Sequence, residues 1–351
     1  VLTFDYQGFR INLLDTPGHQ DFSEDTYRAL TAADSAVMLL DNRKGVEEQT
    51  RKLFSVCRKR RLPIVTLVNK CDRVGEDPFG LLDDVQTHLG ITCYPMTWPV
   101  RREERLIGVC DRLTEQVLLY TSNQDHGQTL PPATSYAMDD PALDEALEPA
   151  VLDPLREELE LLSVAGEKMD QEAVDRGEAT PVFFGSALTN YGLDVFFQRV
   201  LDMAPAPGPM ESNKGPVSPE EDPFSGFIFK VQANMNLRHR DRVAFLKVCS
   251  GRFEAGSEAI VPRTGKTLRL AQPQEIMARE RSHAGETVAG DVVGLHDRGS
   301  LRVGDTVSAV PGLEYAGVPR FSPEHFSQVR LEDHLRRKHL DRGLRHLAEE
   351  G

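Results

Sequence analysis

Runs of apolar residues alternate with amphipathic stretches in the first third of the chain. Residues 36–40 form a continuous apolar run that ends at Asp41. A second run, over residues 63–68, leads into Asn69. Between the two, residues 45–61 carry apolar side chains at helical spacing and charged side chains at the remaining positions. Continuous apolar runs are typical of parallel strands that are buried on both faces by helices. The pattern predicts a doubly wound α/β sheet.

A hairpin and a helix are predicted before the first buried run. Residues 1–7 and 9–15 are rich in apolar and β-branched side chains and flank a Gln7-Gly8 pair, which favours a tight turn. Residues 21–34 then have a helical pattern. We expect this hairpin and helix to belong to the sheet domain.

The pattern changes twice between residue 75 and the end of the sheet domain. From about 76 to 175 it loosens into short helical, extended and turn-rich pieces, which predicts an insertion. Residues 180–205 restore the order of buried strand, turn and helix. The sheet domain is therefore predicted to span residues 1–205.

The second half of the chain has a different organisation. Pro, Gly and Ser dominate residues 206–223, which predicts a linker. Residues 224–316 contain short alternating strands separated by Gly, Asp and Asn, which predicts an antiparallel β-barrel or sandwich. From 317 to 351 the pattern predicts the helix-containing start of a third, α+β domain.

Composition and charge narrow the class of protein. The 351 residues carry a formal net charge of −14, so DNA is not an expected partner, although a local basic face can still dock on RNA. The five cysteines are scattered without a Cys-x-x-Cys pair, which fits a reducing cytosol. We find no signal-peptide pattern and no apolar run that is long enough for a bilayer, and we expect a cytoplasmic protein without a membrane partner.

Three polar clusters follow apolar runs, at the points where strands are predicted to end. They are residues 15–19, 69–72 and 185–188. Ligands of open α/β sheets bind outside the carboxyl ends of the strands. Three such clusters in one sheet domain predict a binding site along this edge.

The Asn69-Lys70-Cys71-Asp72 cluster has the chemistry to recognise a guanine base. The Asp72 carboxylate can accept hydrogen bonds from the ring N–H and the exocyclic amine of guanine. The stem of Lys70 can lie along the base, while Asn69 can bond to a base acceptor or tie loops together. The alternative is an Asx turn that only closes the strand.

The Asp15-Thr16-Pro17-Gly18-His19 cluster suits phosphate chemistry. Asp15 at a strand end can hold a hydrated Mg²⁺ through water. Gly18 lets a backbone N–H approach a terminal phosphate, and His19 can orient or polarise an attacking water. The alternative is a Pro-Gly turn beside a solvated histidine.

The third cluster is less specific. Ser186 and the amide of Ala187 can contact a base, but a turn of small residues between a strand and a helix is the ordinary explanation. Its position in the chain, after the other two clusters, favours the binding interpretation.

The order Asp-x-x-Gly-His, Asn-Lys-x-Asp and Ser-Ala-Leu resembles the third to fifth nucleotide-binding motifs of translational GTPases. Residues 13–41, 240–251 and 321–331 are similar to bacterial class-II peptide-chain release factors, and the similarity extends over essentially the whole chain. The resemblance implies a P-loop-type G domain with an insertion, a β-barrel and the start of a third domain. It also implies a GTPase that dissociates class-I release factors from the ribosome after termination.

The resemblance assigns roles to the site residues. It implies that Asp15 contacts Mg²⁺ through water, that Gly18 senses the γ-phosphate and that His19 orients the attacking water. Residues 22–30 would belong to switch II, whose order depends on that phosphate. We expect the side chain of Cys71 to point away from the base. The resemblance implies the following nucleotide-binding residues: Asp15, Thr16, Pro17, Gly18, His19, Asn69, Lys70, Cys71, Asp72, Ser186, Ala187 and Leu188.

The cofactors and partners follow from the same resemblance. We expect GTP or GDP and Mg²⁺ as cofactors. The expected partners are the ribosome, with its rRNA and proteins, and the class-I release factors.

The chain departs from this family in one motif. It contains no G-x-x-x-x-G-K-[ST] sequence, because the single Gly-Lys-Thr, residues 265–267, has Ile260 where the first glycine is required and lies in the predicted barrel. The switch I threonine is also absent. P-loop groups hold the phosphates during phosphoryl transfer. We therefore expect a fragment that binds and hydrolyses GTP weakly, exposes an apolar sheet edge and is poorly stable alone.

Two other functions remain open at this point. One is a ribosome-interaction module with a degenerate G domain that does not hydrolyse GTP. The other is a different translational GTPase, such as an elongation or ribosome-protection factor.

Overall fold

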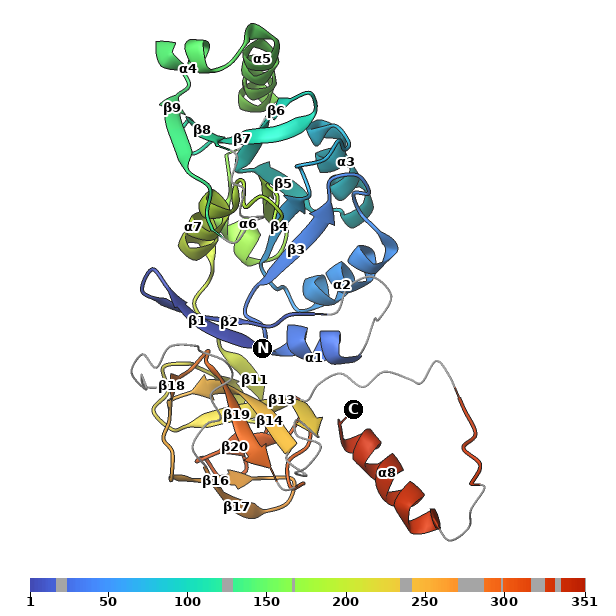
Figure 1. Ribbon diagram of the computed structural model, residues 1–351. Helices are drawn as coiled ribbons and strands as arrows, with labels where there is room; N and C mark the ends of the chain where they lie inside the picture. The colour runs from blue at the N-terminus through green and yellow to red at the C-terminus, as the bar shows by residue number, and fades with distance from the viewer. Residues whose placement is uncertain are drawn as a thin grey trace. The chain divides into compact units, whose positions relative to one another are not determined.

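The chain divides into two compact units in its computed structural model (Figure 1). The first, called the sheet unit, comprises residues 35–205, and the second, called the barrel unit, combines residues 1–34 with 206–351. The residues that the structure describes are 1–16, 24–121, 129–165, 168–233, 242–270, 287–297, 299–316, 326–331 and 336–350.

A parallel four-stranded sheet forms the centre of the sheet unit. Its strands are, in spatial order, β3 (Ala36–Asp41), β4 (Ile64–Asn69), β10 (Ala179–Phe184) and β5 (Thr92–Pro95). Every residue of β10 is buried, as expected for a strand that is covered on both faces. Inside this core the buried hydroxyls of Thr66 and Thr180 form a hydrogen bond with each other at 2.8 Å.

Helices cover both faces of this sheet (Figure 1). They are α2 (Glu48–Lys59), α3 (Pro78–Leu89), α6 (Gln171–Asp175) and α7 (Leu193–Met203). Val174 of α6 and Phe196 of α7 join Val65 and Leu67 of β4 in one buried apolar cluster. The doubly wound α/β arrangement that the alternation of runs predicted is confirmed.

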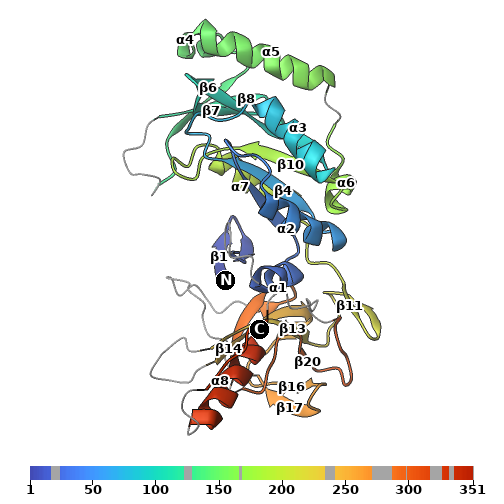
Figure 2. The same ribbon diagram turned by 90° about the vertical axis from the view of Figure 1, so that its right-hand side faces the viewer.

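A second sheet in the same unit is antiparallel. Its strands, in order, are β6 (Thr97–Arg102), β7 (Arg105–Asp111), β8 (Gln116–Tyr120) and β9 (Ala133–Ala137), and two helices follow, α4 (Pro141–Ala146) and α5 (Pro149–Ala165). Figure 2 shows α5 running along this sheet. The fully buried ring of Trp98 packs edge-on against Phe184 of the central sheet, and its indole N–H donates to Glu158 of α5 at 2.6 Å. Trp98 thus joins both sheets and the helix.

The range predicted as an insertion, about 76 to 175, contains part of the central sheet. β5 pairs with β10 in parallel register, with Thr92 opposite Ala179. α3 leads into β5, so the separate antiparallel sheet begins only at Thr97. A four-residue strand is too short for periodicity to separate it from the extended pieces around it.

An antiparallel six-stranded sheet forms the barrel predicted for the second half of the chain. Its order is β17 (Lys266–Arg269), β16 (Glu258–Val261), β20 (Thr306–Ser308), β13 (Ser225–Ala233), β14 (Arg242–Ser250) and β19 (Val292–Asp297). Ile228, Leu246 and Val307, all fully buried, lie in its apolar core. Two short strands, β15 (Arg252–Phe253) and β18 (Thr287–Val288), pair beside it, and α8 (Arg337–Glu350) lies near the C-terminal end.

The predicted linker, residues 206–223, is partly ordered. It contains a hairpin of β11 (Met210–Ser212) and β12 (Gly215–Val217). The Lys214 ammonium donates to the carbonyl of Pro311 at 2.7 Å, which ties the hairpin to the barrel. A composition rich in Pro and Gly indicated turns correctly but did not reveal this pairing.

Residues 1–34 group by their contacts with the barrel unit, and the predicted domain over 1–205 stays a prediction. β1 (Leu2–Tyr6) and β2 (Phe9–Leu13) form a two-stranded sheet of their own, and α1 (Glu24–Ala32) follows them. Ala32 lies in a buried cluster with Phe229 and Phe245 of the barrel. The buried Lys247 of β14 pairs with Asp34. Burial and ion pairing, which local periodicity does not encode, decide this grouping.

The sheet edge formed by β3 carries exposed apolar side chains. Val37 is 47% exposed and Leu39 is 59% exposed. This confirms the expected apolar edge. Among the described residues, no helix has both the length and the apolar character needed to cross a membrane.

Candidate functional site

The loops after β4 and β10 lie side by side because the two strands are parallel. Phe184 is in register with Val68, so both strands end at the same edge of the sheet. The Gly185 N–H donates to the Val68 carbonyl at 2.9 Å, and the Cys71 N–H donates to the Gly185 carbonyl at 3.2 Å. The structure therefore brings together the second and third polar clusters that the sequence predicted.

Asn69 ties these two loops to each other. Its side-chain Oδ1 accepts hydrogen bonds from the backbone N–H of Lys70 at 2.7 Å and of Ala187 at 2.9 Å. Of the two roles considered for Asn69, the structure shows the tie between loops. The Ala187 N–H, considered as a contact to a base, donates to Asn69.

Asp72 is held by a serine from the neighbouring loop. The Ser186 hydroxyl donates to Oδ1 of Asp72 at 2.6 Å, and its oxygen accepts from the N–H groups of Leu188 and Thr189 at 3.2 and 3.3 Å. Ser186 is fully buried, whereas the Asp72 side chain is 14% exposed, with Arg73 at 3.6 Å. A fixed carboxylate with an accessible edge can accept hydrogen bonds from a ligand.

Lys70 is anchored by a carboxylate from a third strand end. Its ammonium donates to Oδ2 of Asp41 at 2.7 Å, and its backbone has φ of 68°, a left-handed conformation uncommon outside glycine. Burial of Asp41 opposes ionisation. The hydrogen bonds from Lys70 and the Arg43 N–H, with the charges of Lys70 and Lys44, outweigh it and hold the pKa of Asp41 below its usual value.

Asp41 was not among the predicted site residues. The available signal was its place at the end of a buried run, like Asn69 in the next strand. Because β3 and β4 are parallel and pair Asp41 with Asn69, both residues reach the same edge.

Cys71 and Leu188 face in different directions. The Cys71 thiol is buried and lies 3.3 Å from the Val68 carbonyl. Burial raises the pKa of this thiol to about 12, so it stays protonated at neutral pH. Leu188 is 55% exposed at the surface of its loop.

The first polar cluster is only partly described. Asp15 and Thr16 follow β2 in the barrel unit, with Asp15 exposed and Thr16 half-buried. Pro17, Gly18 and His19 lie outside the described residues. Among the residues that are described, no three His, Cys, Asp or Glu side chains lie together in a way that could hold a metal ion.

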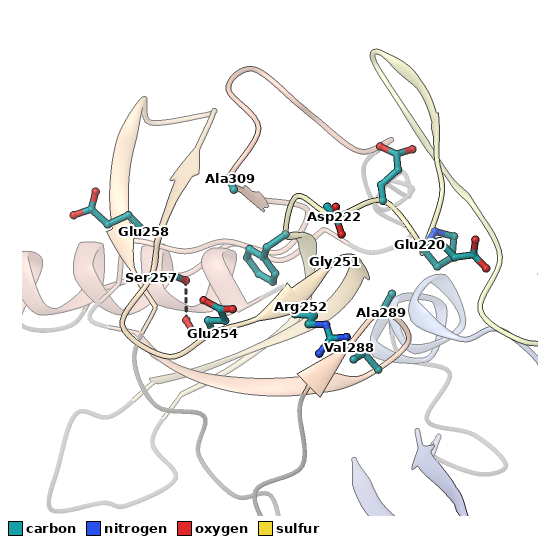
Figure 3. A pocket seen from close by; sticks show the side chains of 13 residues that line it. Glu220, Asp222, Gly251, Arg252, Glu254, Ser257, Glu258, Val288, Ala289 and Ala309 are labelled. Atoms are coloured by element: carbon teal, nitrogen blue, oxygen red, sulfur yellow. Dashed lines mark hydrogen bonds between the residues drawn. The ribbon is translucent and has the colours of Figure 1, made fainter.

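One described cavity lies elsewhere, in the barrel unit (Figure 3). It has a volume of about 670 Å³. Its lining includes one basic residue, Arg252, and five acidic ones, which are Glu220, Glu221, Asp222, Glu254 and Glu258. None of the predicted site residues lines it. The Gly-Lys-Thr sequence also lies in this unit, where Gly265 ends the turn after β16 and Lys266 begins β17.

Two family models match the chain. The family model of the elongation factor Tu GTP binding domain matches residues 1–206, and that of elongation factor G domain 2 matches residues 223–310. The chain belongs to the elongation factor Tu GTP binding domain family. The match treats residues 1–34 and the sheet unit as one family domain, whereas contacts within the structure group residues 1–34 with the barrel.

Curated relatives show which translation factors the chain is similar to. The chain is 50% identical to Peptide chain release factor 3 of Symbiobacterium thermophilum and 48% identical to the protein of that name from Synechocystis sp., in each case over 100% of the chain. It spans 66% and 64% of the length of these two relatives. The expected resemblance to peptide-chain release factors is confirmed.

A solved structure supports the fold. A crystal structure of a Thermus thermophilus protein matches with a TM-score of 0.68 and 23% sequence identity, covering 99% of this chain and 52% of that one. At this identity the likeness bears on the fold alone. It agrees with an α/β domain followed by a β-barrel.

Proposed function

We propose that the chain is part of a GTP-binding translation termination factor. In this function it promotes dissociation of class-I release factors from the ribosome, coupled to GTP hydrolysis. Identity of 50% over the whole chain to a protein named Peptide chain release factor 3 supports the proposal. The partners are then the ribosome and a class-I release factor, and the compartment is the cytoplasm.

The observation that carries nucleotide recognition is the bond between Asp72 and Ser186. The Ser186 hydroxyl occupies one lone pair of Oδ1 and fixes the carboxylate at the open edge of the sheet. A fixed carboxylate can accept from both the ring N–H and the exocyclic amine of guanine, whereas adenine offers no such pair. Guanine selectivity therefore follows from Asp72 in this proposal.

The phosphates and Mg²⁺ are assigned to the first cluster. The exposed carboxylate of Asp15 suits a contact to a hydrated cation, which takes oxygen ligands and retains several waters. Mg²⁺ bound through water to Asp15 would neutralise phosphate charge, while Gly18 would sense the γ-phosphate and His19 would orient the attacking water.

Guanine selectivity is tested by the substitution Asp72→Asn. The amide keeps the shape of the side chain but replaces an acceptor oxygen by a donor NH₂, which matches the 2-oxo group of xanthine. We expect affinity for GDP to fall about 100-fold and affinity for xanthosine diphosphate to rise, measured by ligand-observed NMR titration. Asp83→Asn, at an exposed carboxylate of α3, is the matched control. Unchanged GDP selectivity in Asp72→Asn would contradict the proposal.

Hydrolysis is tested by His19→Ala in the protein expressed from its complete reading frame. We expect GTP binding to persist and ribosome-stimulated GTP hydrolysis to fall by at least about 100-fold, because the attacking water loses its orienting group. His88→Ala, at a half-exposed histidine of α3, serves as the control. Normal turnover in the His19 variant would exclude this role.

A further inference from the structure

The loop that carries Ser186 is braced by the antiparallel sheet. Tyr120, the last residue of β8, stacks on Tyr191 with ring centroids 4.8 Å apart and an interplanar angle of 13°. The Tyr191 carbonyl accepts a hydrogen bond from the Ser186 N–H at 3.0 Å. Tyr191 therefore connects the ring stack to the backbone of Ser186, whose hydroxyl holds Asp72.

The hydroxyl of Tyr120 fixes its ring. It donates to Oδ1 of Asp194 at 2.6 Å, in the first turn of α7, and Tyr120 is only 8% exposed. Burial, together with the Asp194 carboxylate, raises the pKa of Tyr120, so the hydroxyl remains a donor at neutral pH. One aromatic side chain thus contacts both the loop and the helix that follows it.

Two further bonds join the same elements. The Asn190 amide donates to the Thr129 carbonyl at 3.2 Å, from the chain that follows β8. Arg199 of α7 pairs with Asp111 of β7 at 2.6 Å, and both side chains are largely buried. The antiparallel sheet therefore contacts the loop and α7 through Tyr120 and Asp111, and the segment between β8 and β9 adds the bond from Asn190 to Thr129.

The loop has little space in which to relax. A side chain at Gly192, whose φ is 77°, would place its Cβ 2.7 Å from the Phe184 carbonyl oxygen. A Cβ at Gly185 would lie 2.9 Å from the Tyr191 carbonyl oxygen. The backbone is therefore closely packed at both ends of the loop, next to Ser186 and next to Tyr191.

We propose that Tyr120 is a positioning residue for guanine recognition. It acts through Tyr191 and Ser186 and sets where the Asp72 carboxylate meets the 2-amino group of the base. The inference rests on the proposed guanine-nucleotide binding and extends it, because it gives the antiparallel sheet a part in selectivity.

The test compares GDP with inosine diphosphate, which lacks the 2-amino group. Both affinities are measured by ligand-observed NMR titration of the protein. In Tyr120→Leu we expect the preference for GDP over inosine diphosphate to fall about fivefold, since the stack is lost and the carboxylate is no longer held in register. A role confined to stability would lower the thermal midpoint and leave this ratio unchanged.

Tyr136→Leu is the matched control. Tyr136 lies on β9 opposite Val117, near the start of β8, whereas Tyr120 ends that strand. We expect its ratio to match that of the parent protein. A folded Tyr120→Leu with the parent ratio would overturn the proposal.

A second variant covers the case in which Tyr120→Leu does not fold. Tyr191→Leu removes the same stack from the less buried ring, and the same fall in ratio is expected. An unchanged ratio there would also overturn the proposal. A parent protein without any preference for GDP over inosine diphosphate or ATP would instead refute the proposed function, and the inference with it.

Discussion

Asp297 in the barrel unit and Asp72 in the sheet unit are held in opposite ways. In the barrel, Asp297 is 2% exposed, and its Oδ1 accepts from the Ser300 N–H, the Ser300 hydroxyl and the Leu301 N–H. At the edge of the central sheet, Asp72 has one side-chain donor, Ser186, and an accessible face. A buried carboxylate with several donors stabilises a turn, whereas one at a strand end with acceptor capacity to spare is available to a ligand.

The barrel repeats this use of charge. Arg263 pairs with the buried Asp305 through two hydrogen bonds, at 2.5 and 2.8 Å, and the carboxylate also accepts from the Arg302 N–H. The sheet unit repeats its own pattern at Asp41, which anchors Lys70 beside the surface. The comparison teaches that burial and the number of partners, rather than residue type, separate structural carboxylates from candidate ligand contacts.

The largest expected effect is on the stability of the barrel. Asp297→Ala leaves the nearly buried Arg242 without its carboxylate at 3.6 Å and removes the acceptor of two backbone N–H groups. We expect the free energy of unfolding to fall by about 4 kcal/mol, measured by urea denaturation. Guanine-nucleotide affinity measured on the folded fraction should not change. A fall in the free energy of unfolding of less than about 1 kcal/mol would contradict the distinction between structural carboxylates and candidate ligand contacts.

A smaller effect is expected at the sheet edge, and on binding rather than folding. Ser186→Ala removes the hydrogen bond to Asp72 and leaves the carboxylate free to turn. We expect affinity for GDP to fall about tenfold, while the free energy of unfolding falls by about 1 kcal/mol. Ser163→Ala removes an exposed hydroxyl on α5 and is the control. Full GDP affinity in Ser186→Ala would show that Asp72 needs no support.

The smallest effect concerns pH. Because the pKa of Asp41 is lowered in the folded state, its ionisation contributes stability above the unfolded pKa, near 3.8, and this contribution is lost as pH falls through the folded pKa. We expect Asp41→Asn to be less stable than the parent by under about 1 kcal/mol at pH 7. The two should become equal only once the pH lies below the folded pKa of Asp41, which is itself lower than 3.8, as measured by denaturation at several pH values. A difference that is independent of pH would indicate a role unrelated to charge.

Two of the three predicted clusters lie together in the structure, because both follow strongly apolar runs that form neighbouring parallel strands. Asn69 and Asp72 were proposed as site residues because β4 has a continuous buried pattern that stops abruptly at a polar loop. Asp41 was missed because a single acidic residue after an apolar run does not indicate a binding role until its partner, here Lys70, is known. Tyr120 was missed for a related reason, since an aromatic residue in a short strand is ordinarily part of the core.

The sequence by itself determined which segments are buried strands, where they end in polar residues and which chemistry those residues carry. Local periodicity and residue type are sufficient to locate these segments. Buried positions recur every two residues in a half-buried strand and every three to four residues in a helix. Only the tertiary structure decided that Asn69 bonds to Ala187, that Tyr120 stacks on Tyr191 and that residues 1–34 group with the barrel. The two residues of each pair lie 71 or more positions apart along the chain. Whether they meet depends on how whole helices and strands pack, which local sequence patterns do not encode.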